Sequence, residues 1–254
     1  MLASVASAVR AALRILVMLS LVVLAGEATA GPVESSLRGR TVAIDPGHNG
    51  GNSRHAREIS RLVDAGTHEK ACDTVGTQTR TGYTESAHNL DVALRLAVVL
   101  RRAGARVVLT RRTNSDWGPC ITRRAAIGNR AHADVAISIH ADGGPTGGRG
   151  FHVIYPATVR GLTDDIAAAS YRLALAVRRA YRAETGLPYA TYTAPVGLAR
   201  RSDLGGLNLS DVPKVFLEAG NMRNATDARL LASPAFRQRE ANAIARGLAA
   251  FLRG

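Results

Sequence analysis

The sequence of 254 residues predicts a single α/β domain: a mostly parallel, twisted sheet of about six strands with helices on both faces. Two observations predict this fold. Short apolar runs of strand length alternate with longer segments of helical periodicity, and this alternation is typical of parallel sheets. In addition, the chain after residue 30 carries no internal repeat, low-complexity tail or linker, so we expect residues 31–254 to form one domain.

The apolar patterns place the elements in order. Residues 41–45 form a strand that Pro46 and Gly47 stop, and a long polar connection follows over residues 49–83. A helix then runs from Glu85 to a C-cap at Gly104. Further strands are predicted at "RVVLTRR", "DVAISIHAD", "FHVIYP" and "KVFLEAGN", and further helices at "CITRRAAIGNRAHA", "TDDIAAASYRLALAVRRAYRAETG", "ATDARLLAS" and "PAFRQREANAIARGLAAFLRG".

Residues 1–30 have the pattern of a secretory signal peptide. Arg10 and Arg14 give a basic start, an apolar run covers residues 15–26, and an A-x-A site ends at Ala30. The alternative is an uncleaved anchor helix, but the run has 12 residues and falls short of the roughly 20 that span a bilayer. We therefore expect cleavage after Ala30, no membrane span in the mature chain, and export to the periplasm or cell wall.

The charge of the chain is strongly basic, with 33 Lys and Arg against 20 Asp and Glu. A basic surface on an exported protein suits an anionic envelope or wall polymer, although a merely solvated surface remains an equal alternative. Aromatic residues make up only 4% of the chain and do not alternate with the arginines. Stacking platforms for nucleic acid are therefore not expected, and neither is a nucleic-acid partner.

The chain has two cysteines, Cys72 and Cys120. In an exported protein an even count of two is most simply one disulfide, which here would tie the 49–83 connection to the start of the second helix. Neither cysteine has the partner spacing of a zinc ribbon, so metal binding by thiolate is not expected.

Three predicted strands end on side chains that can bind metal or carry a proton: His48, His140 and Glu218. A fourth such residue, Glu85, opens the first helix. Parallel strands end at the same edge of a sheet, so these residues are expected to converge there. Two His and one carboxylate form a catalytic zinc set, and a further carboxylate then serves as general base.

Each of these residues also has an ordinary structural explanation. A His at a strand end is often a hydrogen-bonded turn residue, and Glu85 fits the first turn of a helix, where the dipole favours an acid. No compact HExxH signature supports the set. Glu218 is different because it follows the apolar run "PKVFL", and poor solvation would raise its pKa and suit it to proton transfer.

Four blocks in order carry a family resemblance: "AIDPGHNGG", "ESAHNLDVALRLAVVLRRAGARVVLTRR", "RAAIGNRAHADVAISIHAD" and "VPKVFLEAGNMRNATDARLL". Over residues 40–254 the chain resembles the zinc-dependent N-acetylmuramoyl-L-alanine amidases of the amidase_3 type. The resemblance implies that His48, Glu85 and His140 bind one Zn²⁺ per chain and that Glu218 is catalytic. It also implies a peptidoglycan or muropeptide substrate, cut between the lactyl group of N-acetylmuramic acid and L-alanine of the stem peptide, by a monomer.

The chain departs from the family pattern in three places. His48 and Glu85 lie 37 positions apart, a longer path than the family usually has, so the 49–83 connection is an insertion. "AGNM" follows the last-strand Glu where "xGF" is usual, which would alter the substrate rim. The surroundings of Glu85 also differ, which makes Glu85 the least secure ligand; His88 is a conceivable substitute or outer partner, although a helix-face role is expected for it.

Two rival functions remain open at this point. A zinc carboxypeptidase would need a clamp for a terminal carboxylate, which the sequence does not exclude. A wall-binding protein without activity would show loss of a His or of the last-strand Glu, and neither is lost. An anionic stem peptide suits a cationic groove, and the arginines between residues 149 and 201 could supply the positive charge. The sequence does not single out one of these arginines.

Overall fold

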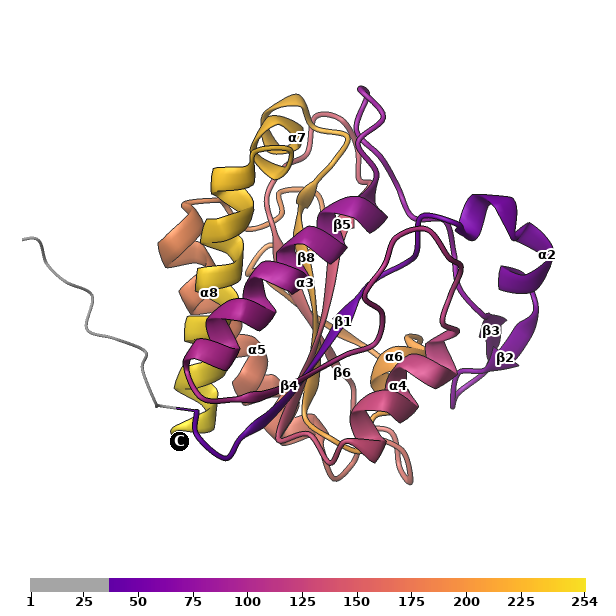
Figure 1. Ribbon diagram of the computed structural model, residues 1–254, viewed down its shortest axis with the longest axis vertical. Coiled ribbons are helices and arrows are strands. Elements are labelled where there is room, and N and C mark those ends of the chain that lie inside the picture. The colour runs from indigo at the N-terminus through magenta and orange to yellow at the C-terminus, as the bar shows by residue number, and fades with distance from the viewer. Residues whose placement is uncertain (1–36) are drawn as a thin grey trace, which may run out of the picture. The chain divides into compact units, whose positions relative to one another are not determined.

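The computed structural model describes residues 37–254, and the predicted signal peptide lies outside this range. Among the described residues, one six-stranded sheet has the order β4-β1-β5-β8-β6-β7 (Figure 1). Its strands are β1 (Thr41–Pro46), β4 (Arg106–Leu109), β5 (Val135–Asp142), β6 (His152–Pro156), β7 (Leu198–Arg201) and β8 (Lys214–Asn221). The predicted fold class, a mostly parallel α/β sheet, is confirmed.

The four strands β4, β1, β5 and β8 are parallel, and β6 and β7 run the other way, with β6 antiparallel to β8. Strands β1, β5 and β8 occupy the middle of the sheet and are largely buried. Near-continuous apolar runs suit strands that are covered on both faces, which is why the sequence pattern identified them. Because the three strands are parallel, their carboxyl ends share one edge of the sheet.

Helices cover both faces of the sheet (Figure 1). One face carries α3, α5 and α8, which pack side by side, and the other face carries α4 and α6. The helices are α3 (Glu85–Arg102), α4 (Ile121–Arg130), α5 (Ala167–Thr185), α6 (Gly205–Asn208), α7 (Ala225–Leu231) and α8 (Pro234–Leu252). Within the described range no helix is long and apolar enough to cross a membrane.

The 49–83 connection is more ordered than a polar loop. It contains the 3-10 turn η1 (Asn52–Arg54), the short helix α2 (Ala56–Ile59) and an antiparallel hairpin of β2 (Leu62–Asp64) and β3 (Glu69–Ala71). The predicted disulfide joins Cys72, just after β3, to Cys120, the N-cap of α4, and this prediction is confirmed. The insertion is therefore fastened to the domain beside the strand ends.

The boundaries of two helices can be compared with those predicted from the sequence. The first helix begins at Glu85, as predicted, after an N-cap at Thr84. Its C-cap is Ala103, and the predicted cap residue Gly104 follows directly, in the left-handed region. The long helix α5, in contrast, begins at Ala167, later than the Thr and Asp start that was expected. Thr163 instead donates to the Ala157 carbonyl oxygen and accepts from the Val159 amide, so its hydroxyl closes the preceding turn.

Candidate metal centre and active site

The structure brings together the side chains that end the central strands. His48 follows β1, His140 lies near the end of β5, and Glu85 is the first residue of α3. One potential ligand atom from each of these residues lies within 4.8 Å of the others. Such a group of two imidazoles and one carboxylate could hold a metal ion, and His88 is not part of it.

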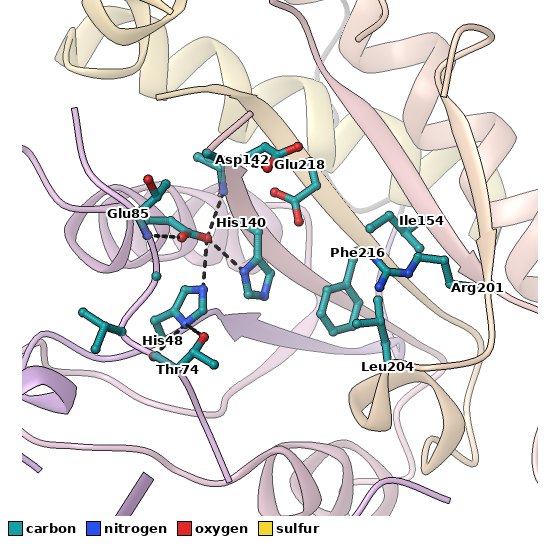
Figure 2. A pocket seen from close by; sticks show the side chains of 15 residues that line it. His48, Thr74, Glu85, His140, Asp142, Ile154, Arg201, Leu204, Phe216 and Glu218 are labelled. Carbon is teal, nitrogen blue, oxygen red and sulfur yellow. Dashed lines mark hydrogen bonds and ion pairs between the residues drawn. The ribbon is translucent and has the colours of Figure 1, made fainter. Parts of the chain in front are cut away.

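The Glu85 carboxylate lies between the two imidazoles (Figure 2). Its Oε1 is 3.2 Å from His48 Nε2 and 3.0 Å from His140 Nδ1. The Oε2 atom accepts a hydrogen bond from the Thr77 amide at 2.9 Å. Although burial opposes it, the two imidazoles hold the pKa of Glu85 well below its usual range, so this carboxylate is ionised.

The two histidines have opposite proton preferences. Burial alone would lower the pKa of His48, but the carboxylates of Glu85 and Asp73 outweigh burial and raise this pKa to about 10. For His140 burial dominates and lowers the pKa. In the metal-free protein these shifts favour the imidazolium form of His48 and the neutral form of His140.

Close backbone approach makes this cluster compact. A Cβ on Gly47 would lie 2.1 Å from His140 Cε1, and one on Gly76 would lie 2.7 Å from Glu85 Oε2. Gly76 also has φ of +80°, and His48 itself has φ of +56°, a region that residues other than glycine seldom adopt. Backbone strain at a non-glycine residue is typical of functional sites, and here it turns the His48 imidazole toward its partners.

Residues of the insertion hold the outer side of His48. Its Nδ1 lies 2.9 Å from the Thr74 carbonyl oxygen and 3.4 Å from Asp73 Oδ1. Asp73 is itself held by the buried guanidinium of Arg124, which also pairs with Asp45 at 3.0 Å. Outer partners of this kind fix the orientation of a metal-binding imidazole, and Cys72 anchors this segment from the adjacent position.

Glu218 lies beside the cluster on the neighbouring strand. Its register partner on β5 is His140, and both side chains project from the same face of the sheet. Burial, the Glu85 carboxylate and Asp142 together raise the pKa of Glu218 well above its usual range. The raised pKa predicted from the apolar run therefore agrees with the structure, and the neighbouring carboxylates add to it.

An open cavity of about 430 Å³ contains these groups (Figure 2). His48, Glu85 and His140 line this cavity, with Glu218 and Asp142 next to them, and Ile154, Leu204 and Arg201 lie on the far side. Phe216 stacks on the His140 ring with centroids 5.1 Å apart, which restricts the orientation of that imidazole. All arginines between residues 149 and 201 lie in the described part of the chain, and Arg201 is the one that lines this cavity.

Comparison with known proteins identifies the family. Residues 42–250 match the Amidase_3 family, described as N-acetylmuramoyl-L-alanine amidase. The chain belongs to this family. The match includes all four predicted site residues and confirms the family resemblance that the motifs carried. The chain is thus a peptidoglycan amidase, which cleaves between N-acetylmuramic acid and L-alanine.

Mycobacterial amidases are similar to this chain along most of its length. The N-acetylmuramoyl-L-alanine amidase Rv3717 of Mycobacterium tuberculosis is 40% identical over 225 residues, which are 88% of this chain and 91% of the relative. The structure of the amidase Ami1 from Mycobacterium smegmatis has 41% identity and a TM-score of 0.80, covering 85% of this chain and 98% of that one. The apo form of Ami1 from Mycobacterium abscessus has the same identity and TM-score, with 99% of its chain covered.

His88 is not on the exposed face of its helix. It is fully buried in the amidase, and its Nε2 lies 3.1 Å from Glu240 Oε2 on α8. His88 therefore lies on a face of α3, as expected, and this face packs against α8 in the core. The structure also agrees with an outer role, since Asn89 connects His88 to Glu85.

The "AGNM" sequence also acts inside the amidase. The side-chain amide of the fully buried Asn221 donates to the carbonyl oxygens of Pro145 and Gly148, each at 2.8 Å. Asn221 therefore stabilises the loop after β5 through two hydrogen bonds to its backbone.

Sequence reasoning missed several residues around the candidate metal-binding group. Asp73, Thr74 and Gly76 lie in the insertion, where no periodicity marks them, and the disulfide and Arg124 determine their position. Asn89 was detectable, because it follows Glu85 by four residues and so lies on the same face of the helix.

Proposed function

We propose that His48, Glu85 and His140 hold one Zn²⁺ and that Glu218 carries protons during amide hydrolysis. Two imidazoles and one carboxylate are the protein ligands of a catalytic zinc site that keeps a position open. Support comes from the unusual packing of an ionised carboxylate between two imidazoles, all facing an open cavity. The zinc dependence that is general in the family agrees with this donor set.

A bound zinc would acidify a water molecule and polarise the amide carbonyl of the substrate. The remaining chemistry falls to Glu218. Because its pKa is raised, this carboxylate can take a proton from the attacking water and then deliver it to the departing amine of L-alanine. Thr74 and Asp73 keep the His48 imidazole oriented while this occurs.

The cavity also supports an orientation for the stem peptide. Arg201 lies on the side of the cavity away from His48, as Figure 2 shows, and Asp203 pairs with its guanidinium. Asp203 occupies the Nε and Nη2 edge of this guanidinium. We assign the other edge, formed by Nη1 and Nη2, to a carboxylate of the stem peptide, since a guanidinium has five N–H donors and can bind a second carboxylate. The substrate would be the muropeptides and peptidoglycan of the envelope, reached after export and removal of residues 1–30, by a monomer.

Mass spectrometry of muropeptide digests tests this proposal. Metal-free and zinc-reconstituted protein are incubated with muramyl peptides, and the product masses are compared. We expect free stem peptides that begin with L-alanine, formed only by the zinc-loaded protein. Products cut inside the stem would indicate a carboxypeptidase, and cleavage by the metal-free protein would contradict the zinc assignment.

A further inference from the structure

A set of fully buried polar side chains connects the proposed site to the helical face of the sheet. These four residues, Asn89, His88, Glu240 and Tyr181, have no exposed surface and come from α3, α5 and α8. We refer to them as the buried relay. A buried polar group is costly unless its hydrogen bonds are satisfied, so such a chain of groups in the core requires an explanation.

The relay begins at two functional positions. The Asn89 amide donates to the Gly47 carbonyl oxygen at 3.3 Å and lies 3.4 Å from Glu85 Oε1. Gly47 directly precedes His48, so one amide contacts both the peptide before one proposed ligand and the carboxylate of another. Since the amide nitrogen faces these two acceptors, the Asn89 oxygen must face His88.

The hydrogen-bond partners of His88 show which of its ring nitrogens carry a hydrogen. Its Nδ1 lies 3.1 Å from the Asn89 oxygen, which can only accept, so Nδ1 carries a hydrogen. Its Nε2 lies 3.1 Å from Glu240 Oε2, so one further proton is held between the imidazole and the carboxylate. Although burial opposes it, Glu240 raises the pKa of His88, which favours the imidazolium form of His88.

The relay ends beside the proposed general base. The hydroxyl of Tyr181 lies 2.6 Å from Glu240 Oε1 and 2.9 Å from the carbonyl oxygen of Ala219. The hydroxyl has one hydrogen and both neighbours are acceptors, so the hydrogen is shared in a three-centre bond. Ala219 directly follows Glu218 on β8, so Tyr181 holds the Ala219–Gly220 peptide group, which lies one residue beyond the Cα of Glu218.

We propose that the buried relay is a positioning device that holds the Gly47–His48 peptide group, the Glu85 carboxylate and the Ala219–Gly220 peptide group, next to Glu218 on β8, at fixed relative positions. The inference rests on the proposed roles of those residues and assigns His88, Glu240 and Tyr181 as positioning residues. An apolar core of the same volume would stabilise the fold equally well or better. Hydrogen bonds are directional, so the relay can hold the proposed metal ligands and the proposed general base in a fixed relative position, which an apolar core would not do.

The first test separates positioning from stability. The double variant His88→Leu/Glu240→Leu removes both charged partners together, a change that is often neutral or stabilising in a core. We expect a folded protein whose melting temperature changes little, because the gain from removing two desolvated groups offsets the hydrogen bond that the Asn89 oxygen loses. Zinc binding should be weaker by about 10–100-fold in calorimetric titration of the metal-free protein. A double variant that binds zinc and turns over substrate like the wild type would overturn the proposal.

The conservative variant Glu240→Gln should keep the hydrogen bonds of the relay and so retain the zinc affinity and kcat that the double variant loses. Its amide oxygen can accept from Tyr181, and its amide nitrogen can donate to a neutral His88, so the relay stays connected without the charge. We expect zinc affinity and kcat close to those of the wild type. Defects in Glu240→Gln as large as those in the double variant would mean that charge, and not the connection, is what matters, which contradicts the proposal.

The second test addresses the other end of the relay. Tyr181→Phe frees the Ala219 carbonyl and should lower kcat by about tenfold or more while zinc affinity stays unchanged. The matched control is Ser170→Ala, which removes a buried hydroxyl that accepts from the Lys214 amide at the start of the same strand. We expect this control to lose stability but keep kcat.

Equal kcat values in Tyr181→Phe and Ser170→Ala would overturn the proposal, even if the double variant does not fold. The wild type separates this failure from failure of the proposed function. Wild-type protein that neither binds zinc nor cleaves muropeptides would contradict the site assignment. Wild-type activity that all relay variants retain would contradict only the relay.

Discussion

At the scale of single residues, the proposed site contains two glutamates that lie close together but have opposite proton affinities. The pKa of Glu85 is held low by the two imidazoles, whereas burial, Glu85 and Asp142 raise that of Glu218. Carboxylates whose pKa values are driven apart are typical of a ligand and an acid–base group with separate roles. Substitution should therefore separate these roles.

Glu218→Gln keeps the volume of the side chain but cannot accept a proton. We expect zinc content to stay near one per chain, while turnover falls by about 10²–10⁴-fold. Glu85→Ala should instead lose zinc, and His48→Ala and His140→Ala should do the same, because each removes one of three ligands. Metal analysis beside a rate measurement checks this. Loss of zinc from Glu218→Gln, or near-normal turnover, would refute the assigned roles.

Arg201 offers a second test at this scale. Arg201→Gln removes the cation that faces the proposed stem-peptide carboxylate, and we expect a higher KM with kcat little changed, because the lost contact is present before and during the reaction. A suitable control is Arg200→Gln, which removes the same charge from the neighbouring position of β7, outside the residues that line the cavity. An equal rise of KM in both variants would point to general charge attraction.

The sequence predicted the candidate side chains at this scale for a simple reason. His48, His140 and Glu218 each end an apolar run, so their chemistry stands out against the strand before them. The groups that orient them were hidden. Asp73 and Tyr181 act through contacts with residues far away in the chain, and nothing in their local sequence distinguishes them.

At the scale of elements, the disulfide connects the insertion to the sheet edge. The bond between Cys72 and Cys120 closes a loop over a sequence separation of 48, and next to it Asp73 and Thr74 contact the His48 imidazole. It therefore contributes in two ways. It lowers the entropy of the unfolded chain, and it fixes the segment that orients a proposed metal ligand.

The double variant Cys72→Ser/Cys120→Ser tests both contributions. For a loop of this size the chain-entropy relation gives a destabilisation of about 4 kcal/mol. Zinc affinity should fall as well, by about 10–100-fold, because the partners of His48 are less fixed. Denaturant unfolding and calorimetry measure the two effects, and thiol counting on the denatured wild type serves as control. Two free thiols, or an unchanged unfolding midpoint, would contradict this account.

Elements with strong periodicity were predictable, and short polar ones were not. The central strands and the helices α3, α4 and α8 agree with the patterns read from the sequence. Strand β7, of sequence LARR, and the β2–β3 hairpin escaped prediction because they are short and partly exposed, without alternation. The antiparallel direction of β6 could not be predicted either, because an apolar run indicates a strand but not its direction in the sheet.

At the scale of the whole molecule, protonation of the buried site groups couples stability to pH. The pKa of Asp73 falls from 3.8 to about 2, and those of Asp45 and Glu85 are also lowered. A carboxylate with a lowered folded pKa stabilises the fold above its unfolded pKa, and this contribution is lost as pH falls. His140, whose pKa burial lowers, adds to the same loss in acid.

His48 has the opposite sign. Its pKa rises from 6.5 to about 10 in the metal-free fold, so its contribution is fully present below pH 6.5 and is lost as pH rises through about 10. Bound zinc requires a neutral imidazole and therefore displaces this proton. With one proton released, zinc affinity should increase about tenfold for each pH unit over this range.

Thermal unfolding between pH 6 and pH 9, with chelator and with zinc, checks this prediction. The melting temperature of the metal-free protein should fall toward alkaline pH, and the stabilisation by zinc should grow over the same interval because the metal takes the place of the proton on His48. His48→Gln provides the control: it removes the titrating group, so its metal-free curve should flatten and zinc should have little effect. A zinc-induced shift that stays constant with pH in the wild type would show that His48 carries no proton to displace.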